Sequence, residues 1–266
     1  MRALYTRIEA IESFAADVAH EIKNPLTSIR SAVETLERVK DDAARDKLLA
    51  LIVQDVGRLD RLISDISDAS RLDAELVREA TEPLDMVPFL EGLHQVYEAT
   101  RRDGDPHVKL TVVPDPDAPG RGFVVNGLEG RLGQVFRNLI NNAVSFSKSG
   151  DIIDVTLFRR IYKGQDVVCV VVEDSGPGIP EENLESIFQR FYTERPEKDE
   201  FGTNSGLGLS ISRQIVEMLD GRIWAENRAG AADGEVAGAR FVVILPVRKG
   251  SETAAGKTRG SRGGRA

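Results

Sequence analysis

Apolar residues recur at helical spacing in two long segments at the start of the chain. In the first segment they stand three or four residues apart, or at the sum of these spacings: Leu4, Ile8, Ile11, Ala15, Val18, Ile22 and Ile29. The second segment, from about Asp46 to Leu76, has the same rhythm at Leu48, Ile52, Val56, Leu59, Ile63 and Ile66. Such a row is typical of the seam between packed helices. The pattern therefore predicts two long amphipathic helices.

The segment "VKDDAARDK" between them is short and charged, which favours a turn between antiparallel helices. Two helices cannot enclose their own apolar rows, so we expect a homodimeric four-helix bundle. Pro25 lies inside the first helix, where it removes a backbone donor and crowds the preceding turn. A bend or a local loosening is therefore expected at this proline.

After "EATEPLD" the pattern changes to alternating helices and strands. We expect helices over residues 86–100, 128–146 and about 206–219. The expected strands are "VKLTVV", "GFVV", "DIIDVTLF", "DVVCVVVED", "GRIWAEN" and "ARFVVILP". Mixed elements with hairpin-type spacings indicate an α+β layer sandwich. We thus predict a helical domain over 1–78, a sandwich domain over 79–248 and, because it has almost no apolar content, a disordered basic tail over 249–266.

Composition and charge favour an ordinary globular protein and argue against nucleic-acid-binding and membrane-spanning proteins. The chain is 41% hydrophobic and 29% charged, as in ordinary globular proteins. Its formal net charge of -8 argues against a nucleic-acid-binding surface. The single cysteine, Cys169, lies in an apolar run and is expected to be a buried strand thiol. No apolar stretch is long enough to span a membrane and no signal peptide is present, so we expect a soluble chain, although an anchor could precede residue 1.

Two polar residues in "NLINNA" are candidates for binding a metal ion. Asn138 and Asn142 are four residues apart and therefore share one helical face. Their amide oxygens could hold Mg²⁺ that takes its other ligands from water and phosphate, as when it accompanies a nucleotide. A solvated helix face is the alternative.

Two glycine-containing loops are candidates for a nucleotide site. In "EDSGPGIP", Gly176 and Gly178 would let the backbone approach a flat ligand, and Asp174 could accept a hydrogen bond from an exocyclic amine such as that of adenine. In "GTNSGLGLSI" a loop runs into a helix start, whose backbone donors favour phosphate. Either loop alone could be an ordinary turn.

The order and spacing of these motifs along the chain identify a family much more specifically than either loop does alone. With "QVFRNLINNAVSF", "DSGPGIP", "IFQRFY" and "GTNSGLGLSI" in sequence, the second domain resembles the ATP-binding domain of sensor histidine kinases, of the Bergerat or GHKL type. The stretch "FAADVAHEIKNPLTSIR" matches the H box of that family, which related ATPases lack. The segments "SIRSAVETL" and "RLDRLISDISDASRLDAEL" look like the ChvG/BvrS/ExoS type.

This resemblance implies ATP and Mg²⁺ as ligands and places them on numbered residues. Asn138 and Asn142 correspond to the metal-binding positions. The implied nucleotide contacts are Asn138, Asn142, Asp174, Gly176, Gly178, Ile179, Thr203, Gly206, Leu207 and Gly208. Two positions depart from the family pattern: Ser145 stands where a basic residue is frequent, and Thr193 where an arginine is usual, with Arg190 or Arg195 as possible substitutes.

The resemblance also implies catalytic roles for three polar residues of the first helix. Without it, these residues would be interpreted as a solvated helix face. His20 corresponds to the phosphoryl acceptor, and Glu21 to the acidic neighbour that holds the second ring nitrogen. Asn24 corresponds to the residue that places a water for phosphatase activity toward a response regulator. The implied protein is the cytoplasmic part of an inner-membrane sensor, a homodimer that passes phosphate to a receiver domain. A non-catalytic nucleotide-sensing dimerisation module is the alternative.

Overall fold

The computed structural model describes residues 2–75, 80–115, 120–192, 206–230 and 235–248. The chain forms two compact units. One comprises Met1–Arg78 and Ile187–Ser210, and the other comprises Glu79–Ser186 and Ile211–Ala266. The predicted basic tail over 249–266 lies outside the described residues.

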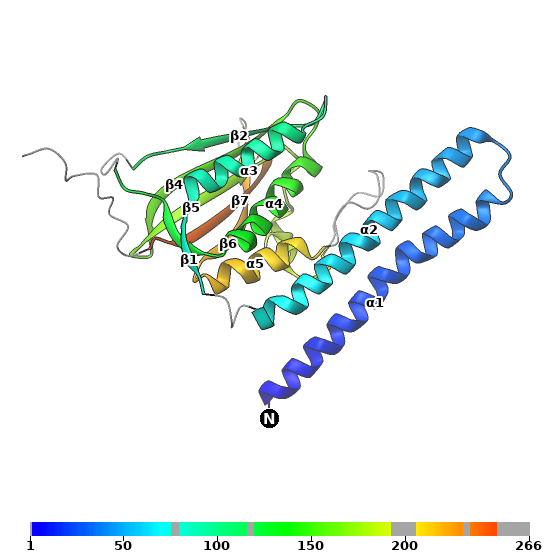
Figure 1. The fold of residues 1–266 in the computed structure, drawn as a ribbon, viewed down its shortest axis with the longest axis horizontal. Coiled ribbons are helices and arrows are strands. Elements are labelled where there is room, and N and C mark those ends of the chain that lie inside the picture. The colour runs from blue at the N-terminus through cyan, green and yellow to red at the C-terminus, as the bar shows by residue number, and fades with distance from the viewer. Residues whose placement is uncertain (1, 76–79, 116–119, 193–205, 231–234, 249–266) are drawn as a thin grey trace, which may run out of the picture. The chain divides into compact units, whose positions relative to one another are not determined.

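The first unit contains a helical hairpin made of α1 (Arg2–Leu36) and α2 (Asp42–Glu75), as the apolar rhythm predicts (Figure 1). α2 begins four residues earlier than expected because Asp41 caps it: the carboxylate accepts a hydrogen bond from the backbone N–H of Ala44 at 2.9 Å. α1 is continuous through Pro25, whose side chain is buried. The proline therefore does not end the helix.

The apolar residues of the hairpin divide into an inner and an outer set. Ala32 and Pro25 of α1 and Leu62 and Asp55 of α2 are buried. Pro25 stands seven residues before Ala32, and Asp55 stands seven residues before Leu62. Among the side chains of the two helices that the structure describes, the most exposed large apolar ones are Leu26, Val33, Leu49, Val53, Val56 and Ile63. Those on α2 follow spacings of four, three and seven, so they form one stripe on the outside of the hairpin. The sequence predicts one apolar row along α2, but its members do not all lie on the same side of the helix. Val56 and Ile63 belong to the exposed stripe.

The second unit is built around a mixed sheet. Its elements are β1 (Glu82–Asp85), α3 (Met86–Thr100), β2 (His107–Val112), β3 (Val124–Gly127), α4 (Glu129–Phe146), β4 (Ile152–Tyr162), β5 (Gln165–Glu173), β6 (Arg222–Ala229) and β7 (Val236–Pro246). Helix α5 (Gly208–Met218) precedes β6 and belongs to this unit from Ile211 onward. Two short 3-10 turns, Glu181–Asn183 and Ser186–Phe188, follow β5. The predicted helices and strands are confirmed within a few residues. β1, a four-residue strand containing Pro83, was not predicted.

The five-stranded sheet has the order β2-β4-β5-β7-β6, and β1 pairs separately with β3. β2 and β4 are parallel, and the other neighbours are antiparallel. Helices α3, α4 and α5 lie on one face of the sheet (Figure 1). The core beneath them is formed by alternate strand residues and the apolar face of α4, including Leu132, Val135, Phe136, Leu139, Ile153, Val155 and Leu157. The expected α+β sandwich is confirmed.

The opposite face of the sheet has its own apolar layer. Val167, Cys169 and Val171 of β5 pack there with Val242 and Ile244 of β7, beneath the larger side chains of Phe158, Tyr162 and Trp224. Cys169 is fully buried, as predicted, and burial raises the pKa of its thiol to about 11. This cysteine is therefore a structural residue of the sheet.

Candidate functional site

Two of the predicted catalytic residues lie on the exposed surface of α1. His20 and Asn24 are both exposed and stand four residues apart, which places them on one face, one turn from each other. Glu21 lies on a different side of the helix. Its carboxylate Oε2 is 3.0 Å from Nη2 of Arg58 on α2, and both side chains are 19% exposed. Glu21 is therefore directed toward the second helix of the hairpin.

Sequence reasoning did not find Arg58. An arginine on an amphipathic helix is ordinarily a solvated residue, and helical periodicity does not reveal which residue of α1 lies opposite it. The antiparallel pairing of α1 and α2 supplies this information, because it brings together positions 37 residues apart. The contact is visible only once the hairpin is formed.

Asp174 is placed immediately after β5 and is almost completely buried. Its Oδ1 accepts two backbone hydrogen bonds, from Gly176 at 2.8 Å and from Ala239 at 3.0 Å. Burial raises the pKa of this carboxyl, an effect that the two N–H groups and Arg228 oppose. A carboxylate held in this way is a fixed acceptor for an N–H donor of a ligand.

The loop after Asp174 requires glycine at two positions. A Cβ on Gly176 would lie 2.8 Å from the carbonyl oxygen of Phe146. Gly178 has a φ of 77°, and a Cβ there would lie 2.3 Å from a methyl carbon of Val236. Glycine is therefore required at both positions by close packing within the protein, and the approach of a ligand to this backbone stays a prediction.

Several residues that hold this loop were missed by the sequence analysis. Gly238 in β7 has a φ of 143°, and a Cβ there would lie 2.0 Å from the carbonyl oxygen of Asp174. Arg228 in β6 donates to the same carbonyl at 2.6 Å. Asn227 contacts the backbone of Ile179. A glycine inside an otherwise apolar strand was the available signal, because it often marks a close backbone approach.

Asn138 and Asn142, the two candidate metal-binding residues of α4, are both half-buried. The side-chain nitrogen of Asn138 lies 3.4 Å from the hydroxyl of Ser212, a fully buried residue of α5. A cation would thus meet the oxygen end of this amide. Neutral amide oxygens suit Mg²⁺ that keeps several waters and phosphate oxygens as ligands, so these residues fit the expected metal. Ser145 donates to the backbone carbonyl of Asn142 at 2.8 Å, so its hydroxyl is engaged within the helix.

The last glycine motif is described only from residue 206 onward. Gly206 has a φ of 72°, and its carbonyl accepts a hydrogen bond from the N–H of Phe191 at 2.9 Å. Leu207 is fully buried, and α5 begins at Gly208 as expected from the motif. Thr203, the departing position Thr193 and the possible substitute Arg195 lie outside the described residues, whereas Arg190 is described and exposed.

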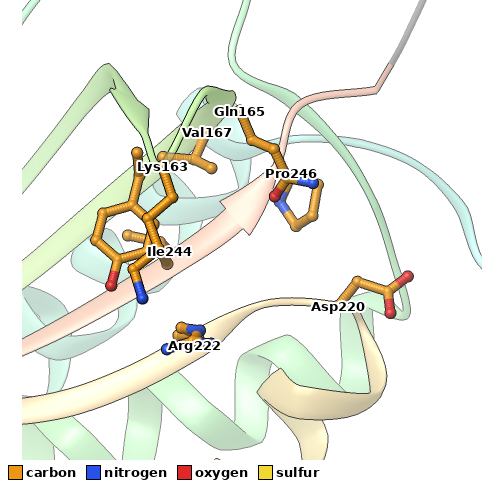
Figure 2. A pocket seen from close by; sticks show the side chains of 8 residues that line it. Lys163, Gln165, Val167, Asp220, Arg222, Ile244 and Pro246 are labelled. Atoms are coloured by element: carbon orange, nitrogen blue, oxygen red, sulfur yellow. The ribbon is translucent and has the colours of Figure 1, made fainter.

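A small pocket of about 110 Å³ lies elsewhere, at one end of strands β4 to β7 (Figure 2). It is lined by Tyr162, Lys163, Gln165, Val167, Asp220, Arg222, Ile244 and Pro246. None of the predicted site residues is among them. We therefore place the candidate ligand site at the loop after Asp174 and not at this pocket. In the part of the chain that the structure describes, no helix has the length and apolar content to cross a membrane.

These features define a class of protein. A helical hairpin with an exposed histidine and a sandwich with a buried aspartate before a glycine loop are the two parts of a histidine kinase core. Residues 10–75 match the family described as His Kinase A (phospho-acceptor) domain. Residues 127–249 match the family described as histidine kinase-, DNA gyrase B-, and HSP90-like ATPase. The chain belongs to the sensor histidine kinases.

Individual relatives support the ChvG type within this family. The chain is 52% identical over 92% of its length to the sensor protein ChvG of Rhizobium meliloti (strain 1021), and 51% identical over 94% to that of Agrobacterium fabrum (strain C58). It spans 42% and 41% of these two relatives. The histidine kinase ThkA, solved in complex with the response regulator protein TrrA, has a TM-score of 0.67 and 26% identity, with 93% of this chain and 65% of ThkA covered.

Proposed function

We propose that this chain uses ATP to phosphorylate its own His20 and then passes the phosphoryl group to an aspartate of a response regulator. The observation that carries the proposal is the exposed position of His20 on α1, within the segment that matches a phospho-acceptor domain. The same chain contains an ATPase-type domain with Asp174 buried at the start of its glycine loop. The chain thus contains both kinds of domain that the proposal requires.

The imidazole of His20 is the nucleophile. Its neutral form presents a lone pair that attacks the γ-phosphorus of ATP, while the bond from that phosphorus to the departing ADP oxygen breaks. Glu21 accepts the N–H of the other ring nitrogen, which fixes the tautomer and stabilises positive charge as it builds on the ring. Exposure of His20 leaves room for an incoming phosphate.

The nucleotide is held by residues that follow the helical hairpin in the chain. Asp174 accepts a hydrogen bond from the adenine amine, and Gly176 and Gly178 allow the ring to approach the backbone of the loop. The other proposed nucleotide contacts are Asn138, Asn142, Ile179, Thr203, Gly206, Leu207 and Gly208. Mg²⁺ bound with ATP through Asn138 and Asn142 would neutralise charge on the phosphates.

The partners follow from the same assignment. A response regulator is proposed as the phosphate acceptor, supported by the relative solved with such a protein. The exposed apolar stripe of α2 supports a homodimeric four-helix bundle, because a second copy would bury it. Asn24, one turn from His20, is proposed to place a water for removal of phosphate from the regulator. The chain would be the cytoplasmic part of a longer membrane-bound sensor.

The test is incubation of the chain with γ-labelled ATP and Mg²⁺. We expect label that is lost in acid and survives alkali, because a phosphoramidate behaves in this way. His20→Ala should abolish the label and leave ATP affinity nearly unchanged, whereas Asn142→Ala should weaken both Mg·ATP binding and transfer. ATP binding without any label in the wild-type chain would instead support a non-catalytic module.

A further inference from the structure

The contact between Glu21 and Arg58 bears directly on the chemistry of His20. Successive residues of an α-helix are about 100° apart, so neighbours in sequence do not face each other. His20 is exposed, while Glu21 extends toward α2 and bonds to Arg58 at 3.0 Å. A carboxylate engaged on that side of α1 is turned away from the imidazole. The arrangement seen here therefore withholds Glu21 from the acceptor.

A second observation shows where the guanidinium of Arg58 could go. Asp55 stands three residues earlier on α2, is only 6% exposed, and its Oδ2 has no hydrogen-bond partner among the described residues. Leaving a buried acceptor without a donor is costly. Residues i and i+3 of a helix are neighbours on one face. An arginine at position 58 can thus reach either Glu21 on the other helix or Asp55 on its own.

We propose that Arg58 and Asp55 are positioning residues that decide whether Glu21 can act on His20. In one arrangement Arg58 holds Glu21, as in the structure, and Asp55 lacks a donor. In the other, Arg58 pairs with Asp55, and Glu21 turns to accept the N–H of His20. Arg58 keeps one carboxylate partner in each arrangement, so the two can be close in free energy. This inference rests on the phosphorylation of His20 proposed above.

The first test is the Arg58→Ala variant of the full chain, assayed for initial rate of labelling across ATP concentrations. Without Arg58, Glu21 is no longer held toward α2, so kcat should rise about two- to fivefold, the range set by a partly exposed ion pair. KM for ATP should not change, since the nucleotide residues are untouched. Arg58→Lys should keep the wild-type rate because an ammonium group can make the same pair. Arg61→Ala, which removes the same charge three residues further along α2, is the matched control and should have no effect.

The second test is Asp55→Asn, which should fold because a neutral amide is less costly to bury than a carboxylate. Losing the alternative partner of Arg58 should lower kcat about two- to fivefold. The double variant Asp55→Asn/Arg58→Ala should show no such fall, because there is then no guanidinium to compete for Glu21. A purely structural effect of Asp55 would persist in the double variant.

The outcomes that overturn this inference are distinct from those that overturn the proposed function. A fall in kcat for Arg58→Ala would mean that Arg58 holds Glu21 productively, and an unchanged kcat would mean that it has no such role. Additive effects of Asp55→Asn and Arg58→Ala would also overturn it. Absence of acid-labile label in the wild-type chain, or label retained in His20→Ala, would instead overturn the proposed function.

Discussion

The side-chain amide of Asn227 exchanges two hydrogen bonds with the backbone of Ile179. The N–H of Ile179 donates to Oδ1 at 2.8 Å, and Nδ2 of Asn227 donates to the carbonyl of Ile179 at 2.6 Å. The amide thus takes the place of a neighbouring strand for one residue of the loop. It fixes the end of the segment that starts at Asp174, although 48 residues separate the partners.

Replacing Asn227 by alanine should loosen this loop. Both backbone groups of Ile179 would lose their partner, and we expect the free energy of unfolding to fall by about 1–3 kcal/mol. ATP affinity should fall as well, because the loop carries Asp174. Urea unfolding and titration with a fluorescent ATP analogue measure the two effects. Asn126→Ala, at an exposed position of β3, is the control. Unchanged ATP affinity would show that the loop holds its shape without the amide.

Gly238→Ala should be strongly destabilising. The new Cβ would lie 2.0 Å from the carbonyl oxygen of Asp174, at a φ of 143° that other residues rarely adopt. We expect a loss of at least about 2 kcal/mol in the free energy of unfolding. Gly130→Ala in the first turn of α4 is the control, because a Cβ there meets nothing within 4 Å. Equal stability of the two variants in urea would contradict the close approach of β7 to Asp174.

Asp174→Asn should separate ligand binding from folding. The amide keeps one oxygen for the N–H groups of Gly176 and Ala239, but replaces the other with a donor. A ligand amine would then face a donor, so affinity for ATP should fall about tenfold or more. Calorimetric titration with Mg·ATP checks this expectation. Binding at wild-type affinity would remove Asp174 from the nucleotide site.

The same variant should reveal the titration of Asp174. Because burial raises the pKa of this carboxyl in the folded protein, its stabilising contribution is complete below its unfolded pKa, about 3.9. The contribution is lost as pH rises through the folded pKa. The free energy of unfolding of the wild type, relative to Asp174→Asn, should therefore fall as pH rises above about 4. A flat difference in thermal melts over this range would contradict the raised pKa.

Asn24→Ala should affect removal of phosphate more than its addition. His20, Glu21 and the nucleotide residues remain, so labelling of His20 should be largely intact. Hydrolysis of the regulator's phosphate should slow about tenfold, because the amide proposed to orient the attacking water is lost. The measurement is decay of a phosphorylated response regulator mixed with each variant and ADP. Equal decay would assign the water to another residue.

Val53→Glu should disrupt the proposed dimer. Val53 is 72% exposed in a single chain and lies within the outer stripe of α2. A carboxylate at this position would have to lose its water on association, at a cost that apolar contacts do not offset. Light scattering should then report a monomer. Lys47→Glu, at an exposed polar position of α2, should leave the mass unchanged. A monomeric wild type would contradict the four-helix bundle.

The sequence alone determined nearly all of the secondary structure and supplied most of the candidate site residues. Helical periodicity located α1 and α2, because burial of one face imposes the 3.6-residue repeat directly on the sequence. The helix over 86–100 was predicted to the residue. The glycines at 176 and 178 could be identified as candidates because they directly follow an apolar strand and an aspartate, where the backbone has to leave the sheet in a loop.

Only the tertiary structure decided which residues from distant segments meet. Arg58 opposite Glu21, Asn227 on Ile179 and Gly238 against Asp174 all depend on strand or helix pairing, which local patterns do not encode. The split of the α2 apolar row into buried and exposed sets likewise depends on where α1 packs. Periodicity gives the face that a side chain occupies, whereas its partner is fixed by the register of another element, and that register is set by packing of the whole unit.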